Sequence, residues 1–501
     1  MKTADLIIFI VFMLGVIAFG SSFYKKNKSS SAFTLGNSNF PGWVVTMSIF
    51  ATFVSSISFL ALPGIAYKSN WNAFVFSLSI PVASYMAIRF FVPLYRKANS
   101  PSAYAYLETR FGVWARIYVS ACYLLTQFMR IGTILYLLAL PLNAMFGWDI
   151  ATIIIITGLA VMIYSLLGGI QAVMWTDAIQ GIILIAGALI SLMIIMYSMP
   201  EGPGQVFTIA AEHHKFSLGS YGFSLTESTF WVVLIYGIFI NLQNYGIDQN
   251  YVQRYMASRN EYEAKKSALL GGLLYIPVSM VFFLIGTSLF AYYTAMPSAL
   301  PAELHDPAMS DKIFPYFIVN SLPTGLTGLL IASIFAAGMS TVSTSLNSSA
   351  TVILTDYYKR YKKSEITDKD SMKVLYISSL IISILGIGIA IALINVESAL
   401  EAWWKLASIF SGGMLGLFLL GAFVKKITPK GAIIGVIVGL IIIVWMSLSP
   451  YIFTSTSMAE YTRPFHGYLT IVFGTIAIFI VGFLSTYLIT NHMSKQSSID
   501  S

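Results

Sequence analysis

Thirteen apolar stretches, each about twenty residues or longer, follow one another along this chain of 501 residues. A helix needs about 20 largely apolar residues to cross the hydrocarbon core of a bilayer. The stretches therefore predict an all-α integral membrane protein with about thirteen transmembrane helices in one polytopic domain. The predicted spans cover residues 4–24, 42–66, 72–95, 117–145, 149–167, 172–198, 228–253, 267–295, 323–357, 373–396, 399–424, 431–449 and 467–490.

The composition excludes a soluble protein. Hydrophobic residues make up 57% of the chain and charged residues only 10%, against about 25% charged residues in soluble domains. The net charge of +8 does not indicate nucleic-acid binding, because the basic residues fall in short loops between the apolar stretches. The one cysteine, Cys122, lies within an apolar stretch, so the sequence offers no disulfide framework and no metal–thiolate site.

The distribution of basic residues predicts the orientation. One alternating set of loops holds 21 lysines and arginines, including the KRYKK cluster at 359–363, and the opposite set holds 5. Because cytoplasmic loops carry the excess of basic residues, the richer set is predicted to be cytoplasmic. The N-terminus is then extracytoplasmic and the C-terminus cytoplasmic, in the cell membrane. The first span is expected to be retained, since KKNK at 25–28 follows it without a small-residue cleavage site.

The order of the spans permits an internal symmetry. Spans two to six form a first five-helix half at about 42–198, and spans seven to eleven form a second at about 228–424. Because five is an odd number, the two halves are inverted relative to each other, as in many secondary transporters. The first span and two additional spans, at about 431–449 and 467–490, flank this core.

The ninth predicted span contains a dense run of hydroxyl groups. Within ASIFAAGMSTVSTSLNSSATV, at 332–352, eight of ten consecutive residues are polar. On a helix, Met339, Val342 and Leu346 gather on one side, against lipid or the protein core, and the polar residues lie on the other. Helix packing explains two or three small hydroxylated residues, but eight favour an ion site. The eight are Ser340, Thr341, Ser343, Thr344, Ser345, Asn347, Ser348 and Ser349.

Two charged residues lie deep within predicted spans. Asp177, in VMWTDAIQGIIL, lies about two turns inside the sixth span, where a carboxylate either binds a cation or a proton or caps a helix near the interface. Hydroxyl and carbonyl oxygens would complete the shell that a hard cation such as sodium prefers. Arg130, in YLLTQFMRIGTILYLL, is too deep to reach an interface easily, so it requires an acidic partner or an anionic substrate.

Polar residues also interrupt the first helix of each proposed half. If the second span unwinds near 51–56, its free carbonyls can bind a cation and its free amides an anion. Pro63–Gly64 is expected to mark the outer end of that span. The seventh span contains a counterpart, NLQNYG at 241–246, and such paired interruptions indicate a binding site near the middle of the membrane. The hydroxyl groups of the second span are those of Thr52, Ser55, Ser56 and Ser58.

Three motifs, in the same order along the chain, resemble the sodium:solute symporter family. They are YSLLGGIQAVMWTDAIQG at 164–181, DQNYVQRY at 248–255 and SIFAAGMSTVSTSLNS at 333–348. The resemblance covers nearly the whole chain and implies a leucine-transporter-like fold of two inverted five-helix repeats. The sequences FATFVSSISF and VMWTDAIQG, and the arginine of FMRIGTILYL, are most similar to the bacterial sialic-acid transporters of this family.

The resemblance also implies two sodium sites and a substrate site. The first sodium site would use backbone carbonyls and hydroxyls, from Ala51, Val54, Ala337, Ser340 and Thr341. The second would surround a carboxylate, with Asp177, Ser340, Ser343 and Thr344. The substrate's carboxylate and hydroxyls would contact four residues, Ser55, Ser56, Ser58 and Arg130.

The third span departs from the sialic-acid branch, because Ala73 and Ser77 stand where that branch can carry a phenylalanine and a glutamine. We count Ser77 among the substrate residues, although the sugar contacts there must differ.

These observations predict a symporter, not an enzyme, that imports an anionic sugar by alternating access. The resemblance implies N-acetylneuraminate as the solute and two co-transported sodium ions as the coupling partners. We expect a monomer in the lipid bilayer that binds no nucleic acid. Neutral sugars, proline and pantothenate are alternative solutes within the family. An ion channel would need a pore-lining repeat, and an intramembrane enzyme would need a nucleophile–base pair or a metal cluster at depth, and the sequence contains no sign of either.

Overall fold

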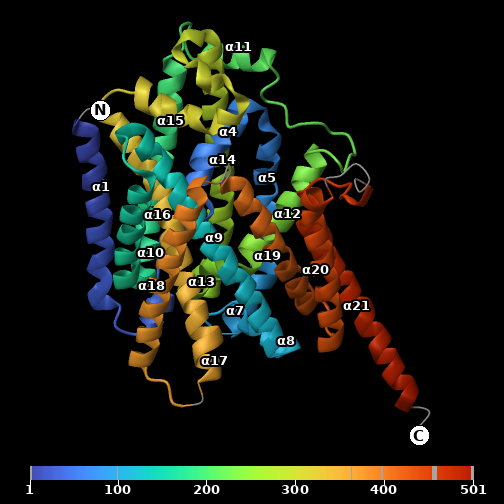
Figure 1. The fold of residues 1–501 in the computed structure, drawn as a ribbon. Helices are drawn as coiled ribbons and strands as arrows, with labels where there is room; N and C mark the ends of the chain where they lie inside the picture. The colour runs from blue at the N-terminus through green and yellow to red at the C-terminus, as the bar shows by residue number, and fades with distance from the viewer. Residues whose placement is uncertain (1–2, 99, 363, 396–398, 454–459, 498–501) are drawn as a thin grey trace.

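The computed structural model describes residues 3–98, 100–362, 364–395, 399–453 and 460–497, and its regular elements are helices (Figure 1). In chain order, the α-helices are α1 (Thr3–Ser21), α2 (Ser30–Leu35), α3 (Gly42–Phe53), α4 (Ser56–Lys68), α5 (Val75–Leu78), α6 (Ile80–Met86), α7 (Val92–Ala98), α8 (Ala105–Phe111), α9 (Val113–Phe146), α10 (Ile150–Tyr197), α11 (Gly204–Glu212), α12 (Phe230–Ile247), α13 (Gln249–Ala257), α14 (Glu261–Ala295), α15 (Ser310–Ser321), α16 (Leu326–Val352), α17 (Lys359–Tyr361), α18 (Asp368–Ala392), α19 (Ala399–Phe423), α20 (Pro429–Ile452) and α21 (Leu469–Ser497). The predicted all-α fold is confirmed.

The number of membrane crossings agrees with the sequence prediction once two elements are considered. Among the described residues, ten helices are long and apolar enough to span a membrane, and the bent pair α3–α4 makes an eleventh. As one straight helix, the 48 residues of α10 would extend about 72 Å, more than twice the apolar thickness of a bilayer. Gly169 breaks α10, so it supplies two of the predicted spans. The remaining span is α19, whose described apolar part, Ile409–Phe423, is shorter.

Gly169 divides α10 into two helical segments that meet at a kink. Its backbone has a φ of 53° and a ψ of −152°, a conformation that side chains with a Cβ rarely adopt. A Cβ at this position would also lie 2.8 Å from the amide of Asn27. That amide donates a hydrogen bond to the carbonyl of Leu167 at 3.4 Å, which satisfies a backbone group released by the break.

Two helices are broken where the sequence shows polar interruptions. The axis bends by 52° between α3 and α4, and both intervening residues, Val54 and Ser55, have extended backbones. Pro63 and Gly64 lie inside α4, which continues to Lys68, so the prediction that they mark its outer end is wrong. The second break is at Asp248, between α12 and α13, where the Asp248 carboxylate accepts a hydrogen bond from the Asn250 amide at 2.8 Å.

Helix α16 lies at the centre of the bundle. Nearly every residue from Thr327 to Val352 is buried, so the apolar side of this helix faces the protein core and not lipid. Its first amides are capped by α1, since Asp5 Oδ1 accepts hydrogen bonds from Gly325 N at 2.7 Å and Gly328 N at 3.1 Å. This carboxylate also complements the positive end of the α16 dipole. The predicted first span is therefore tied to the central helix.

The two ends of the bundle carry different elements (Figure 1). Helices α11 and α15 lie at the end where α1 begins, within segments expected to be loops. Helices α8 and α17 lie at the opposite end, towards which α21 runs. There, Arg116 pairs with Asp356 at 2.6 Å and with Glu108 at 2.7 Å. Because Asp356 is on the π-helical continuation of α16 (Ile353–Tyr358), this ion cluster joins the end of α16 to α8 and α9.

Candidate functional site

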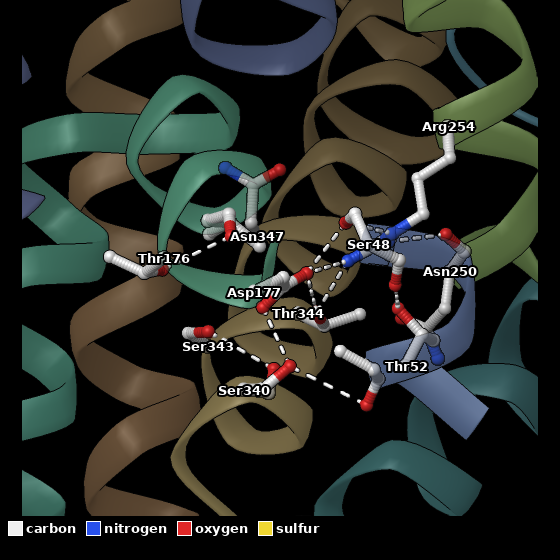
Figure 2. Close-up of polar contacts among 12 residues, drawn as sticks. Ser48, Thr52, Thr176, Asp177, Asn250, Arg254, Ser340, Ser343, Thr344 and Asn347 are labelled. Atoms are coloured by element: carbon white, nitrogen blue, oxygen red, sulfur yellow. Dashed lines mark hydrogen bonds and ion pairs between the residues drawn. The ribbon is translucent and has the colours of Figure 1, made fainter. Parts of the chain in front are cut away.

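A polar cluster surrounds Asp177 between α3, α10, α13 and α16 (Figure 2). The side chain of Asp177 is fully buried. Its Oδ1 accepts a hydrogen bond from Ser340 Oγ at 2.6 Å, and its Oδ2 accepts one from Ser48 Oγ at 2.7 Å. Thr344 Oγ1 lies 3.4 Å from Oδ2. The structure therefore brings together three predicted ligands of the second sodium site, Asp177, Ser340 and Thr344.

Arg254 is the main element of this cluster that the sequence analysis missed. Its guanidinium pairs with Asp177 Oδ2 at 2.6 Å, and both side chains have no exposed surface. It also donates to Ser48 Oγ at 2.7 Å and to Thr344 Oγ1 at 2.6 Å. A fourth hydrogen bond reaches the Asn250 carbonyl at 2.6 Å. Figure 2 shows the arginine extending from α13 across Ser48 to the carboxylate.

The position of Arg254 corrects the sequence analysis, in which the seventh span ends at residue 253 and Arg254 is one of the 21 basic residues of the cytoplasmic loops. Helix α13 is buried along its whole length although four of its nine residues, Gln249, Asn250, Gln253 and Arg254, are polar amides or a cation. Because these polar residues lower the hydropathy of α13, a hydropathy criterion ends the seventh span at residue 253, before the helix ends at Ala257. One signal in the sequence could have identified Arg254 as a buried residue. Asp177 is a carboxylate at membrane depth and therefore needs a partner, and the DQNYVQRY motif supplies a cation, Arg254.

Four of the five residues of the predicted first sodium site also lie together. Ser340 Oγ lies 3.5 Å from the carbonyl oxygen of Ala51, just before the α3–α4 break. One turn along α16, Thr341 Oγ1 donates to the Ala337 carbonyl at 3.2 Å. The fifth residue, Val54, is the first residue beyond α3. Carbonyl and hydroxyl oxygens from two helices thus converge beside a helix break, which is a donor set suited to a hard monovalent cation.

Ser343, the fourth residue of the predicted second site, bonds to its own helix α16 and not to Asp177. Its hydroxyl donates to the Ser340 carbonyl at 3.1 Å, and its own carbonyl lies 3.4 Å from Ser165 Oγ. Ser340 belongs to both predicted sites, since its hydroxyl contacts Asp177 and approaches the Ala51 carbonyl. The two sets of oxygen atoms therefore share one residue and adjoin each other along α16.

Arg130 is partly buried on α9 at the level of the helix breaks. Its Nη2 donates to the Thr52 carbonyl at 3.1 Å, close to the end of α3. The preceding turns of α9 face the second break, because Tyr123 OH and Gln127 Oε1 both bond to the side chain of Asn250. No ion pair of Arg130 occurs among the described residues. The buried carboxylate of Asp248, at the second break, interacts electrostatically with Arg130 without forming an ion pair. A protein carboxylate and an anionic ligand therefore both remain candidates for the predicted negative partner.

The predicted substrate serines occupy two locations. Ser55, Ser56 and Ser58 begin α4, where the Ser55 amide lies 3.4 Å from Ser58 Oγ and the buried Ser56 hydroxyl has no partner among the described residues. Ser77 is on α5 and shares a hydrogen bond with Ser279 of α14 at 2.8 Å. The Ser77 hydroxyl is therefore bonded to α14 in the structure. A contact between Ser77 and the substrate stays a prediction.

Aromatic rings of α12 and α14 pack against Phe53 at the α3–α4 break. Phe53, the last residue of α3, stacks on Tyr245 with centroids 5.5 Å apart and meets Tyr275 edge-on at 4.4 Å. Tyr245 is on α12 and Tyr275 on α14. The site therefore combines an apolar wall, a cation and a set of serine hydroxyls, which is the usual composition of a pocket for a small polar solute.

Broken helices that bring carbonyl and hydroxyl oxygens and a partly buried arginine together inside a multi-pass bundle are typical of membrane transporters of the secondary-active class. The profile of the sodium:solute symporter family matches residues 33–439, and the chain belongs to this family. Two curated relatives match almost the whole chain. The sodium/sialic acid symporter SiaT of Proteus mirabilis (strain HI4320) is 33% identical over 98% of this chain and 95% of the relative. The sodium/sialic acid symporter NanT of Aliivibrio fischeri (strain ATCC 700601 / ES114) is 32% identical over 99% of this chain and 95% of the relative.

Solved structures agree with this assignment. A structure described as the substrate-bound outward-open state of a Na⁺-coupled sialic acid symporter has a TM-score of 0.89 and 32% identity, over 97% of this chain and 98% of that one. Mhp1, a nucleobase-cation-symport-1 family transporter in a closed conformation, has a TM-score of 0.58 at 12% identity, over 90% of this chain and 93% of that one. The second similarity concerns the fold alone.

Proposed function

We propose that this protein is a sodium-coupled symporter that imports an anionic sugar, N-acetylneuraminate, by alternating access. The observation that carries the proposal is the position of Arg130, whose guanidinium contacts the Thr52 carbonyl at the α3–α4 break. The oxygen cluster of Ala51 and Ser340 adjoins the same break. A carboxylate bound by Arg130 and a sodium ion bound by these oxygens would therefore stabilise the same pair of half-helices. Both curated relatives are described as sodium/sialic acid symporters, which supports this solute.

We further propose two sodium ions per cycle, one at Ala51, Val54, Ala337, Ser340 and Thr341 and the other at Asp177, Ser340, Ser343 and Thr344. Each sodium ion that enters down about 100 mV contributes roughly 2.3 kcal/mol. A tenfold concentration ratio adds about 1.4 kcal/mol. Two sodium ions with one monoanion carry a net positive charge inward, so an inside-negative potential assists uptake, whereas one sodium ion would make the cycle electroneutral.

We also propose that the N-terminus is extracytoplasmic and the C-terminus cytoplasmic, and that the transport unit is a monomer in the lipid bilayer. The excess of basic residues in one set of loops supports this orientation. In this arrangement the Arg116–Asp356–Glu108 cluster lies at the cytoplasmic end of the bundle, and α11 and α15 lie at the extracytoplasmic end (Figure 1).

Uptake into proteoliposomes tests the proposal. The panel contains N-acetylneuraminate, its neutral methyl ester, a neutral sugar, proline and pantothenate, each with and without a sodium gradient and an imposed potential. We expect only N-acetylneuraminate to accumulate strongly, with stimulation by both the gradient and an inside-negative potential. Equal uptake in sodium-free medium would contradict the coupling, and uptake that is insensitive to potential would contradict the second sodium ion.

A further inference from the structure

Gln180 is a buried amide that takes no part in the hydrogen bonds around Asp177. It lies on α10, one helical turn beyond Asp177, with 1% of its surface exposed. Neither its amide oxygen nor its amide nitrogen has a hydrogen bond of standard geometry among the described residues, although the Tyr164 hydroxyl interacts with this side chain. A single hydroxyl cannot satisfy both the oxygen and the two N–H groups of an amide. Because an unsatisfied polar group in a protein interior is costly and rare, this buried amide needs a further partner.

The packing of α10 shows which way Gln180 faces. Asp177, one turn before it, contacts Ser340 of α16. Gly187, two turns after it, faces Ser333 of the same helix. Residues three and seven apart share one face of a helix, so Gln180 faces the part of α16 between Ser333 and Ser340, which contains Ala337. The next residue of α10, Gly181, packs against Ala51 of α3.

The hydrogen bonds of Asp177 leave one side of the carboxylate for a cation. Its Oδ2 is shared by Ser48, Arg254 and Thr344. Its Oδ1 has Ser340 as its one partner among the described residues, although a carboxylate oxygen can accept more than one contact. A sodium ion at Oδ2 would have to displace Arg254 from a buried ion pair. A sodium ion at Oδ1 would leave that pair intact.

We propose that the amide oxygen of Gln180 is a ligand of the sodium ion bound by Asp177, on the Ser340 side of the carboxylate and opposite Arg254. This inference rests on the proposed symport function and refines its second sodium site. The donors are then Asp177 Oδ1, the Gln180 amide oxygen and the hydroxyl oxygens of Ser340 and Ser343, an all-oxygen set of the kind that hard cations select. Ser340 would turn its hydroxyl proton away from Asp177 to offer a lone pair. Arg254 remains paired with Asp177 throughout and acts as a fixed positive charge beside the site.

Two substitutions of Gln180 test the ligand role. Gln180→Leu removes the amide oxygen at similar volume, and Gln180→Glu keeps an oxygen at the same place and adds a charge. Two readouts are measured for each: the sodium concentration for half-maximal N-acetylneuraminate uptake into proteoliposomes, and the sodium-dependent rise of the unfolding temperature in detergent without substrate. We expect Gln180→Leu to raise the half-maximal sodium concentration about tenfold or more, with a smaller thermal shift and a lower Hill coefficient. We expect Gln180→Glu to lower the half-maximal sodium concentration.

Ser349→Ala is the matched control, because Ser349 is a fully buried hydroxyl of α16 without a partner among the described residues, and it should leave both readouts unchanged. Wild-type sodium responses in Gln180→Leu would overturn the inference. If that variant does not fold, Gln180→Glu decides, and a raised half-maximal sodium concentration in it would overturn the inference. A wild-type protein without sodium-stimulated uptake or sodium-induced stabilisation would instead contradict the proposed function itself.

Discussion

The guanidinium of Arg254 lies 2.6 Å from the carboxylate of Asp177, and neither side chain has any exposed surface. The two residues are 77 positions apart in the sequence and lie on α13 and α10. Burial of such a pair is tolerated only when its remaining donors and acceptors are satisfied, and Ser48, Thr344, Ser340 and the Asn250 carbonyl do this. The pair therefore fixes α10, α13 and α3 relative to one another beside the hydroxyl-rich helix α16.

Asp177→Asn should reduce both the stability and the sodium response of the protein. Removal of one partner from a buried ion pair costs about 3–5 kcal/mol, because the other charge stays buried without compensation. We therefore expect a lower unfolding temperature and a lower sodium Hill coefficient for uptake. The double variant Asp177→Asn/Arg254→Gln removes both charges and should recover much of the stability while its sodium response remains weak. A single variant with the wild-type Hill coefficient would remove Asp177 from the sodium site.

Arg130→Ala should abolish measurable uptake of N-acetylneuraminate. Loss of one partner of a desolvated charge pair costs about 2–5 kcal/mol, which corresponds to at least about a thirtyfold loss of affinity. Arg130→Lys keeps the charge but loses the planar fork that matches a carboxylate, so an intermediate defect is expected. The measurement is substrate affinity in proteoliposomes, with the neutral methyl ester as a second ligand. Arg89→Ala, at an exposed arginine of the third span, is the control. Normal affinity in Arg130→Ala would exclude the proposed carboxylate contact.

Ser340→Ala should weaken the sodium dependence more than any other single serine substitution on α16. Its hydroxyl contacts Asp177 at 2.6 Å and lies 3.5 Å from the Ala51 carbonyl, so it belongs to both proposed sites. We expect a raised half-maximal sodium concentration, measured by uptake across a sodium titration. Ser345→Ala is the control, since this buried hydroxyl has no partner among the described residues. A wild-type titration curve for Ser340→Ala would contradict the assignment.

Lys215 should make the stability of the protein depend on pH in the alkaline range. This side chain, in the segment between α11 and α12, donates to the Tyr67 carbonyl at 2.6 Å and the Ser69 carbonyl at 2.8 Å. Burial lowers the pKa of Lys215 to about 8, against about 10.4 in an unfolded chain. Between these values the unfolded chain binds more protons, so the free energy of unfolding contributed by Lys215 rises as the pH increases.

Thermal unfolding of the wild type and of Lys215→Met between about pH 7.5 and pH 9.5 measures this effect. As the pH rises and Lys215 loses its proton, the unfolding temperature of the wild type should increase relative to that of Lys215→Met. A difference that stays constant over this range would show that Lys215 does not titrate there in the folded protein.

The positions of the membrane spans could be predicted from hydropathy because their physical cause is local. Each span must bury about 20 consecutive residues in lipid or protein, and that requirement appears in the sequence as a continuous run of apolar residues. The break after Val54 could be predicted for the same reason, since the serines of 55–58 interrupt an apolar run. The break at Asp248 was expected two to seven residues too early, at 241–246, because the amide-bearing residues there continue α12 as a buried helix.

The pairing of side chains could not be predicted, because it depends on contacts between distant helices. Arg254 is assigned to a loop by hydropathy, yet it is fully buried against Asp177. The burial of α16 on all sides has no local signal either, since Met339 and Leu346 are equally compatible with lipid. Helices α8, α11 and α15 were expected as loops because they are short and polar at their ends. The sodium and substrate ligands stay predictions, although the structure places most of them side by side.

The contact of Asp5 with α16 has a consequence for how the protein is made. The partners of Asp5, Gly325 and Gly328, are synthesised more than 300 residues after it. At about 5–20 residues per second, that interval lasts roughly 15–60 seconds. Until Gly325 and Gly328 have been made, the Asp5 carboxylate lacks both of these partners. The central helix of the proposed ion sites is thus capped by a residue that was synthesised more than 300 residues before it.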